Sequence, residues 1–276
     1  MTDSVTVSAK GWIASSAGYD PESSNNVVIL DMAGSPGMVR SPGGFDSLGG
    51  KPQGNNVLHV VRLAGFWMDT VEVTQKLFDS LMGFDPSYHA GCPACPVERV
   101  TWYDALRFCN ARSRAEGLPE AYDLSSRDSV TWTWNPRSPG YRLPTDAEWE
   151  FAARGGSSND WYWGQFVGQA TVGKYAWYDM TSGDSTHPVG KLLPNGFGLR
   201  DVSGNVSEWT WDWFSDPTGD TLFFPKGSSR NLVRKGARGG DFTNLSVELA
   251  LARRLPALPT SRWLALGFRC ARGVMP

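Results

Sequence analysis

The sequence has no long apolar run, no large excess of charge, and few cysteine or histidine residues. No stretch approaches the roughly 20 apolar residues that span a bilayer, and Met1 is followed by a polar segment rather than by a signal-peptide core. The 26 Lys and Arg residues against 28 Asp and Glu residues give a net charge of −2, so no strong field attracts polyanions. These shortages argue against a transmembrane protein and against a nucleic-acid partner.

Only four cysteines are present, and two of them form the motif Cys92-Pro-Ala-Cys95. This spacing fits half of a zinc site or a redox pair, but a second pair with metal-ligand spacing is missing. The sequence does not decide whether Cys92 and Cys95 form a local disulfide or remain two free thiols. Cys109 falls on the apolar face of an expected helix and Cys270 in an expected terminal strand, so both are predicted to be buried.

Turn-forming residues and large aromatic side chains are abundant: the sequence has 31 glycines, 18 prolines and 13 tryptophans. This composition predicts many short elements joined by tight loops, with rings packed between them. Helices are expected in the first half and short strands and loops after Gly155, which gives an α+β class. Residues 1–25 are expected to be a flexible terminus or an added edge strand, and residues 26–276 a single domain.

Three helices are predicted from capping residues and apolar spacing. The first begins at Thr74 and ends at Gly83, with Leu77, Phe78 and Leu81 on one face. The second runs from Thr101 to Gly117, and the third from Thr145 to Gly155. Strands are expected over 27–30 and 57–73, with a hairpin near 130–134, and an irregular loop is expected over 34–56.

Five ordered motifs carry a family resemblance. They lie at 65–74 (Gly-Phe-Trp-Met-Asp-Thr-Val-Glu-Val-Thr), 96–105, 141–154, 196–209 and 267–270. Together they resemble the formylglycine-generating-enzyme, or sulfatase-modifying-factor, family. The resemblance implies a compact C-type-lectin-like fold with little regular secondary structure. The charged residues of these motifs are expected to form structural ion pairs and the tryptophans to pack in the core; these residues are Arg142, Glu148, Arg154, Trp102, Trp149 and Trp209.

The resemblance does not extend to the family's catalytic residues. The enzyme oxidises a substrate cysteine with two of its own cysteines, which precede the closing Gly-Phe-Arg. Residues 239–267 contain no cysteine, and Ser246 and Leu251 fall near the expected places. The three histidines, His59, His89 and His187, are scattered and indicate no general base. We therefore expect no enzymatic activity and no catalytic cofactor.

The segment from residue 201 to residue 208 resembles the calcium loop of the family. On that analogy Asp201 and Glu208 supply carboxylates, and Gly204 and Val206 supply backbone carbonyls, to a structural Ca²⁺ or another cation that prefers oxygen ligands. Alternatively, the two acidic residues cap turns or pair with arginines.

Residues 238–269 keep the family framework, but Leu, Ala, Thr, Ser, Val and Pro stand where relatives carry asparagine. This pattern resembles the variable proteins of diversity-generating retroelements, in which asparagine codons are mutagenised. Glu248 and Trp263 depart from the pattern, because no adenine change in an asparagine codon produces them. The expected ligand-binding residues are Asp241, Thr243, Asn244, Leu245, Val247, Leu255, Pro256, Ala257, Leu258, Thr260, Ser261, Trp263, Leu264 and Ala265. The same leucines could instead belong to the core.

The first hypothesis is a non-enzymatic receptor or adhesin-like protein that binds a protein ligand through residues 241–265. We expect it to be monomeric and to be displayed outside the cytoplasm, at the cell surface. The second is a formylglycine-generating-enzyme-like oxidase or modifying accessory factor with an altered active site. The third is a structural domain, which predicts that residues 243–265 are buried.

Overall fold

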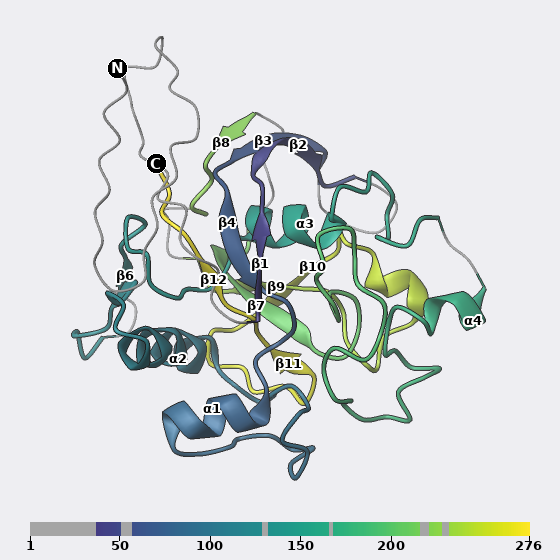
Figure 1. Ribbon diagram of the computed structural model, residues 1–276, viewed down its shortest axis with the longest axis horizontal. Helices are drawn as coiled ribbons and strands as arrows, with labels where there is room; N and C mark the ends of the chain where they lie inside the picture. Colours follow the sequence, from purple (N-terminus) through teal and green to yellow (C-terminus); the bar gives the residue numbers. More distant parts are fainter. Residues whose placement is uncertain (1–36, 51–56, 129–131, 166–167, 216–220, 228–231) are drawn as a thin grey trace, which may run out of the picture.

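In the computed structural model, the described residues are 37–50, 57–128, 132–165, 168–215, 221–227 and 232–276. The expected strand at 27–30 and the terminal segment 1–25 lie outside them. The described chain is a mixture of short strands and short helices joined by long loops (Figure 1). This arrangement agrees with the α+β class.

The helices begin at the predicted threonine caps. Helix α1 (Gln75–Met82) starts where the Thr74 hydroxyl accepts a hydrogen bond from the Leu77 amide at 3.2 Å, and it ends at Gly83 in the left-handed conformation. Only glycine adopts that conformation without a Cβ penalty. The first predicted helix is therefore confirmed at both ends.

Helices α2 (Trp102–Ala115) and α3 (Asp146–Arg154) each start with a capping box. In each box the threonine before the helix accepts from the third helical amide, and the acidic side chain at that position accepts from the threonine amide. Helix α3 stops at left-handed Gly155, as predicted, while α2 ends two residues before Gly117.

The largest sheet has the strand order β10-β9-β7-β11. Its central strands are β7 (Ser207–Trp213) and β9 (Lys235–Arg238), flanked by β10 (Arg254–Ala257) and β11 (Leu266–Gly267). Figure 1 shows α3 above the β7–β9 ladder and α1 with α2 below it. Three of the four strands, β9, β10 and β11, lie within residues 235–267. This C-terminal segment therefore supplies most of the largest sheet.

Two smaller sheets use the segment for which a loop was expected. In one sheet, β4 (Phe66–Asp69) lies between β1 (Met38–Ser41) and β12 (Ala271–Arg272) and pairs with both. In the other, β3 (His59–Leu63) lies between β2 (Gly44–Leu48) and β8 (Leu222–Phe223) and pairs with both. The expectation of a loop over 34–56 was wrong for these strands. Pairing with β3 and β4 satisfies their backbone despite the turn-forming composition, because tertiary context overrides local propensity.

The remaining elements are short. Strands β5 (Tyr122–Asp123) and β6 (Thr133–Trp134) form the predicted hairpin within the described residues. Helix α4 (Gln169–Val172) and a 3₁₀ turn (Ser246–Leu249) follow Gly155, where no helix was expected. Each is a single turn, and periodicity arguments need several turns.

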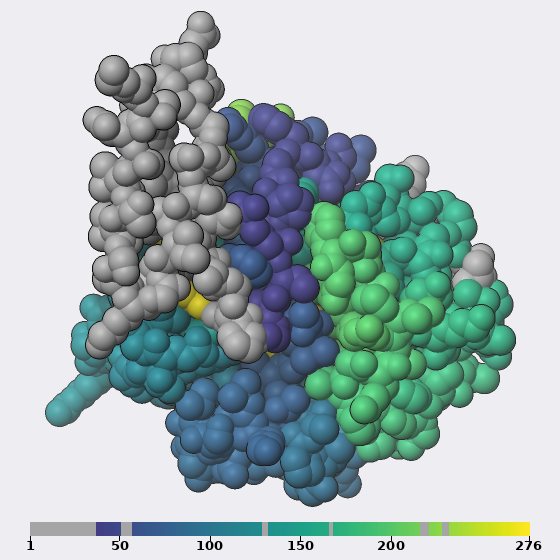
Figure 2. Space-filling view, viewed as in Figure 1, coloured from purple at the N-terminus to yellow at the C-terminus, as the bar shows by residue number. Residues whose placement is uncertain are grey.

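The motif tryptophans lie in the core, as expected. Trp102, Trp149 and Trp209 are 4%, 0% and 0% exposed. Figure 2 shows one face of the molecule, built mainly by the N-terminal strands, α1, α2 and the middle of the chain, with little of the C-terminal segment visible.

Candidate functional site

The C-terminal segment alternates between buried framework and exposed loops. Exposed candidate residues are Thr243, Leu245, Leu258, Thr260, Trp263 and Leu264; partly exposed ones are Asp241, Asn244, Val247, Leu255, Pro256, Ser261 and Ala265. Leu249, Leu251 and Leu266 between them are fully buried. The structural-domain hypothesis, which required residues 243–265 to be buried, therefore does not fit this segment.

The prediction that Ala257 is a ligand-binding residue was wrong. This residue lies at the end of β10, is 0% exposed and belongs to the main core cluster. A ligand cannot touch a side chain in that position. Leu255, two residues earlier, also packs partly against the core. The segment's strand residues are thus framework, and its loops carry the accessible side chains.

The first loop, residues 241–245, is held from beneath. The Phe242 amide donates to the Asn205 carbonyl at 3.0 Å, and the Phe242 carbonyl accepts from the Ser182 hydroxyl at 3.0 Å. Within the loop, Asp241 Oδ1 accepts from the Thr243 amide at 3.0 Å. These bonds fix the backbone while Thr243 and Leu245 face solvent.

The second loop, residues 258–265, is anchored to the start of α2. The amides of Arg99 and Trp102 donate to the carbonyls of Trp263 and Pro259, at 3.2 and 3.1 Å. Arg262 reaches back with Nη1 to the Arg99 carbonyl at 2.8 Å and with Nη2 to Asp104 at 2.9 Å. Trp263 is 44% exposed although its backbone is bound.

Ser207 joins the two loops. Its hydroxyl donates to Asp241 Oδ2 at 3.1 Å, and its amide donates to the Ala265 carbonyl at 2.8 Å. The accessible side chains of both loops therefore belong to one neighbourhood, which we call the loop surface: the exposed and partly exposed residues of 241–245 and 258–265.

The expected cation loop lies in the interior. Glu208 is fully buried, and its two oxygens accept from Arg269 at 2.7 Å each, while Oε2 also accepts from Trp149 Nε1 at 2.7 Å. The alternative that Glu208 pairs with an arginine is what the structure shows. Asp201 Oδ2 accepts from the Gly190 amide at 2.6 Å, and Oδ1 is buried without a hydrogen-bond partner among the described residues.

Glu72 is a buried acidic residue that the motif analysis did not single out. Both of its carboxyl oxygens are buried without a described partner. Burial, and then the negative charge of Asp201, raises the pKa of Glu72 well above its ordinary value, and burial also raises the pKa of Asp201. We call Glu72, Asp201, Glu208 and Arg269 the acidic cluster. Arg269 forms an ion pair with Glu208, and the charges of Arg269 and Arg200 both lower the pKa of Asp201. Three carboxylates against these two arginines leave negative charge in excess when all three are ionised.

The signal that could have found Glu72 is its place between Val71 and Val73, two residues before the end of the motif at 65–74. Within the described ranges no three His, Cys, Asp or Glu side chains are grouped as metal ligands. Backbone carbonyls would therefore have to complete the ligand set of a cation here, a mixture of oxygen ligands that calcium accepts.

The cysteines divide into a disulfide and two buried thiols. Cys92 and Cys95 form a disulfide, so the disulfide alternative is confirmed. Cys109 and Cys270 are free, fully buried, as predicted, and 3.7 Å apart between their sulfurs. Burial raises the pKa of the Cys270 thiol well above its usual value, so its reactive thiolate form is scarce.

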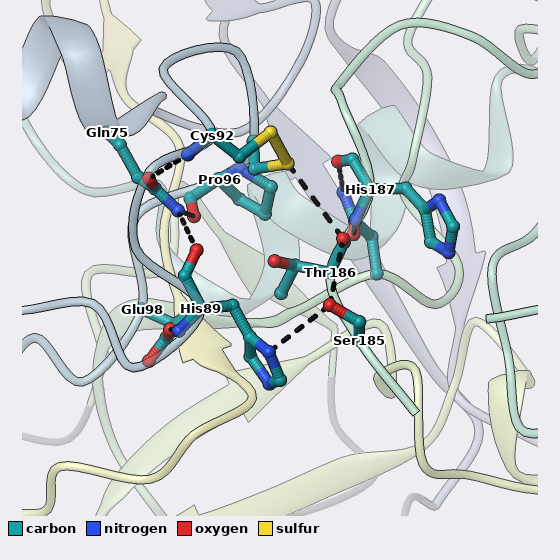
Figure 3. Close-up of a disulfide and its surroundings, with 10 residues drawn as sticks. Gln75, His89, Cys92, Pro96, Glu98, Ser185, Thr186 and His187 are labelled. Atoms are coloured by element: carbon teal, nitrogen blue, oxygen red, sulfur yellow. Dashed lines mark hydrogen bonds between the residues drawn. A yellow bond between two sulfur atoms is a disulfide. The ribbon is translucent and has the colours of Figure 1, made fainter. Parts of the chain in front are cut away.

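The histidines form no catalytic triad among the described residues. His89 Nδ1 lies 3.2 Å from the Ser185 hydroxyl, a contact that sequence spacing could not reveal (Figure 3). The nearby Glu98 accepts from the His89 backbone amide at 2.7 Å rather than from the ring. A carboxylate that orients the imidazole, as nucleophilic catalysis requires, is therefore not supplied by Glu98.

The motif charges form ion pairs, as expected. Arg142 Nη1 lies 2.6 Å from Glu148, and Arg154 Nη2 lies 2.6 Å from Glu150. All four side chains are at most 5% exposed. These residues hold α3 in place.

Comparison with known proteins gives a consistent result. Residues 30–274 match the sulfatase-modifying factor enzyme 1-like domain. The formylglycine-generating enzyme of Streptomyces coelicolor is 31% identical over an alignment of 286 positions, which covers 85% of this chain and 88% of the enzyme. Chaperone protein LppX of Paenibacillus barcinonensis is 39% identical over 184 residues, 57% of this chain; the match spans 65% of LppX, less than two thirds of that relative.

Among solved structures, Treponema denticola variable protein 1 superposes with a TM-score of 0.80 at 32% identity, covering 86% of this chain and 94% of that chain. The C-type-lectin-like fold, implied by the five motifs, and the resemblance to a variable protein, implied by residues 238–269, are both confirmed by this match. The chain belongs to the sulfatase-modifying factor enzyme 1-like family.

Proposed function

We propose that this chain is a non-enzymatic ligand-binding protein, of receptor or adhesin type, that recognises a protein through the loop surface. The observation that carries the proposal is the contrast between fixed backbones and accessible side chains in 241–245 and 258–265. A loop that is already held in place pays little conformational entropy on binding. The same scaffold can therefore present different side chains, as a diversified protein requires.

The chemistry of the loop surface suits a protein ligand. Its exposed apolar side chains, Leu245, Leu258, Trp263 and Leu264, are 41–56% exposed. Tryptophan is enriched among the residues that dominate protein–protein binding energy, and leucines around it exclude water. Arg262, held by Asp104, supplies a polar rim beside Trp263.

The similarity to Treponema denticola variable protein 1 supports this function by analogy. We also propose that the protein acts as a monomer at the cell surface, outside the cytoplasm. A disulfide between Cys92 and Cys95 forms more readily in an oxidising compartment. No helix in the described part of the chain is long and apolar enough to cross a membrane.

The positions expected for catalytic cysteines favour binding over oxidation. Ser246 is partly buried at the start of the 3₁₀ turn, and its carbonyl accepts from Trp161 Nε1 at 3.2 Å. Leu251 is fully buried. Neither side chain offers a thiolate, and the family's oxidation depends on thiolates.

Two libraries test the binding proposal. The first randomises Thr243, Leu245, Leu258, Thr260 and Leu264; the second randomises the buried residues Leu249, Leu251, Ala257 and Leu266. Most members of the first library should keep the parent unfolding temperature and should yield binders to a chosen protein such as lysozyme, while most of the second should not fold. Equal loss of folding in both libraries would contradict the proposal.

The oxidase alternative is tested directly. A cysteine-containing sulfatase peptide is incubated with the protein, copper and oxygen, with the Streptomyces coelicolor enzyme as the positive control. We expect no formylglycine by mass spectrometry in the sample and full conversion in the control. Conversion by this chain would overturn the non-enzymatic assignment.

We further propose that a structural Ca²⁺ binds near Asp201, Gly204, Val206 and Glu208, with Glu72 as an additional carboxylate. The support is the excess of buried negative charge and the unpartnered oxygens of Glu72 and Asp201. Calorimetric titration of the calcium-free protein should show binding that Asp201→Asn weakens and that Asp123→Asn, at an exposed carboxylate, leaves unchanged. Identical heats for all three proteins at the level of dilution would rule the site out.

A further inference from the structure

The Cys92–Cys95 disulfide closes a surface turn between α1 and α2. Gly91, Pro93 and Ala94 around it are exposed, Cys92 is partly exposed, and Cys95 is only 2% exposed. The two sulfurs therefore differ in access. An incoming thiol can approach through Cys92, whereas Cys95 is shielded, so attack at Cys92 with Cys95 as the leaving group is the favoured direction.

The backbone of this turn is held without help from the disulfide. The amides of Gln75 and Lys76 donate to the carbonyls of Cys95 and Pro93, at 2.9 and 3.1 Å, and the Val189 amide donates to the Ala94 carbonyl at 2.9 Å. The Cys92 amide donates to Gln75 Oε1 at 3.3 Å (Figure 3). The turn can therefore keep its shape when the sulfur bond opens, and both sulfurs stay close enough to close again.

The disulfide also contributes little as a cross-link. The stabilisation that a disulfide gives through chain entropy grows with the length of the loop it closes, and here the cysteines are three residues apart. Its reduction should leave the core intact. A bond that is accessible, easily re-formed and dispensable for folding has the properties of an exchange site rather than those of a structural staple.

One polar atom of the neighbouring chain lies beside Cys95. Its sulfur lies 3.9 Å from the Thr186 carbonyl oxygen (Figure 3). That oxygen can accept a weak hydrogen bond from the thiol that reduction leaves at Cys95. The reduced form of the pair therefore has a place for its thiol hydrogen without a change of the turn.

We propose that Cys92–Cys95 is a thiol–disulfide exchange site for small thiols of the glutathione type, with Cys92 as the sulfur attacked. An incoming thiolate bonds to Cys92 Sγ, the Cys92–Cys95 bond breaks, and Cys95 leaves with the electron pair and is protonated. A second thiolate then attacks the small molecule's sulfur in the mixed disulfide and releases Cys92 as a thiolate. Two small thiols are oxidised to one disulfide, and the cysteine pair is reduced.

The first test needs no variant. The native protein is equilibrated with buffers of reduced and oxidised glutathione, thiols are trapped by alkylation, and each cysteine is assigned by mass spectrometry. We expect Cys92 and Cys95 to become reduced together while near-ultraviolet circular dichroism stays unchanged. The buried Cys109 and Cys270 are internal controls that should stay unalkylated before denaturation. A pair that resists reduced glutathione until the protein unfolds would overturn the proposal.

A matched pair of variants tests the assigned direction. Cys95→Ser leaves Cys92 free, and with oxidised glutathione it should form a mixed disulfide and release one reduced glutathione at least about tenfold faster than Cys92→Ser, in which only shielded Cys95 remains. Equal rates for the two variants, or a faster Cys92→Ser, would reverse or remove the asymmetry. If either variant fails to fold, the native-protein titration still decides the proposal.

Discussion

Two of the buried charge clusters in the described part of the chain differ in how their positive and negative charges balance. In the first, the framework cluster, Asp146 and Glu150 of α3 contact Arg154, Arg238 and Arg254. In the acidic cluster Arg269 forms an ion pair with only one of the three carboxyl groups, Glu208, while Arg269 and Arg200 both act on Asp201 through their charge. Buried charges are tolerated when they are paired and costly when they are not. In the framework cluster, arginines of the chain itself therefore pair with both carboxylates. In the acidic cluster, by contrast, the excess negative charge favours uptake of a proton or of a cation from solution.

The largest effect is expected from breaking the balanced cluster. Arg238→Ala should lower the free energy of unfolding by about 3–5 kcal/mol, because it leaves Asp146 and Glu150 with fewer cationic partners in the interior. Urea unfolding monitored by tryptophan fluorescence measures the change. A loss below about 1 kcal/mol would mean that Arg154 and Arg254 suffice for both carboxylates.

A smaller effect of opposite sign is expected in the acidic cluster. Glu72→Gln should raise the free energy of unfolding of the calcium-free protein by about 1–3 kcal/mol at neutral pH, because it removes a buried group that is costly to ionise. The same variant should lose any stabilisation by added calcium, seen as a smaller shift of the unfolding temperature. Destabilisation in chelator would show instead that the Glu72 charge is already compensated.

The pH dependence of stability sharpens the comparison further. Burial, and then the charge of Asp146, raises the pKa of Asp212 to about 7. A carboxyl group with a raised pKa holds its proton longer in the folded state, so stability is lost as pH rises from the unfolded value toward 7. Asp212→Asn should reduce this loss between pH 4 and about 7. An unchanged pH profile would show that Asp212 is ionised throughout.

The smallest effect is expected at an exposed pair. Arg114 Nη1 lies 2.6 Å from Glu120, but the two side chains are 60% and 39% exposed. Arg114→Ala should change the free energy of unfolding by less than about 1 kcal/mol, since water screens such pairs. A larger loss would show that this short contact is stronger than solvent-exposed ion pairs normally are. The measurement uses the same urea titration.

Local signals predicted the helices well. Thr74, Thr101 and Thr145 cap the helices from positions that the sequence displays directly, because capping depends on residues within one turn. The strands at 37–50 were missed because their pairing partners, β3 and β4, lie elsewhere in the chain. Turn-forming residues there describe local preference and carry no information about distant hydrogen bonds.

The candidate site was predicted in outline but not in its details. The loop residues around Trp263 are accessible, while Ala257 is buried by strand pairing between β10 and β9, which the codon pattern cannot register. For the expected cation loop, the analogy named Asp201 and Glu208 as ligands, but it could not show that Glu208 binds Arg269 or that Glu72 lies in the same cluster. These contacts join segments that are far apart in sequence.

The two kinds of cysteine pair also bear on how the chain matures. Cys92 and Cys95 can find each other as soon as that segment is synthesised, whereas Cys109 and Cys270 are separated by 161 residues. Closing the longer loop costs about 3–4 kcal/mol more in chain entropy. An oxidising folding machinery would thus form the local bond first and leave the distant thiols to be enclosed when α2 packs against the C-terminal strand. Four cysteines can pair in three ways. Because the local bond forms first, it removes Cys92 and Cys95 from the pairings that would join them to Cys109 or Cys270, and no isomerase is needed to correct such pairings.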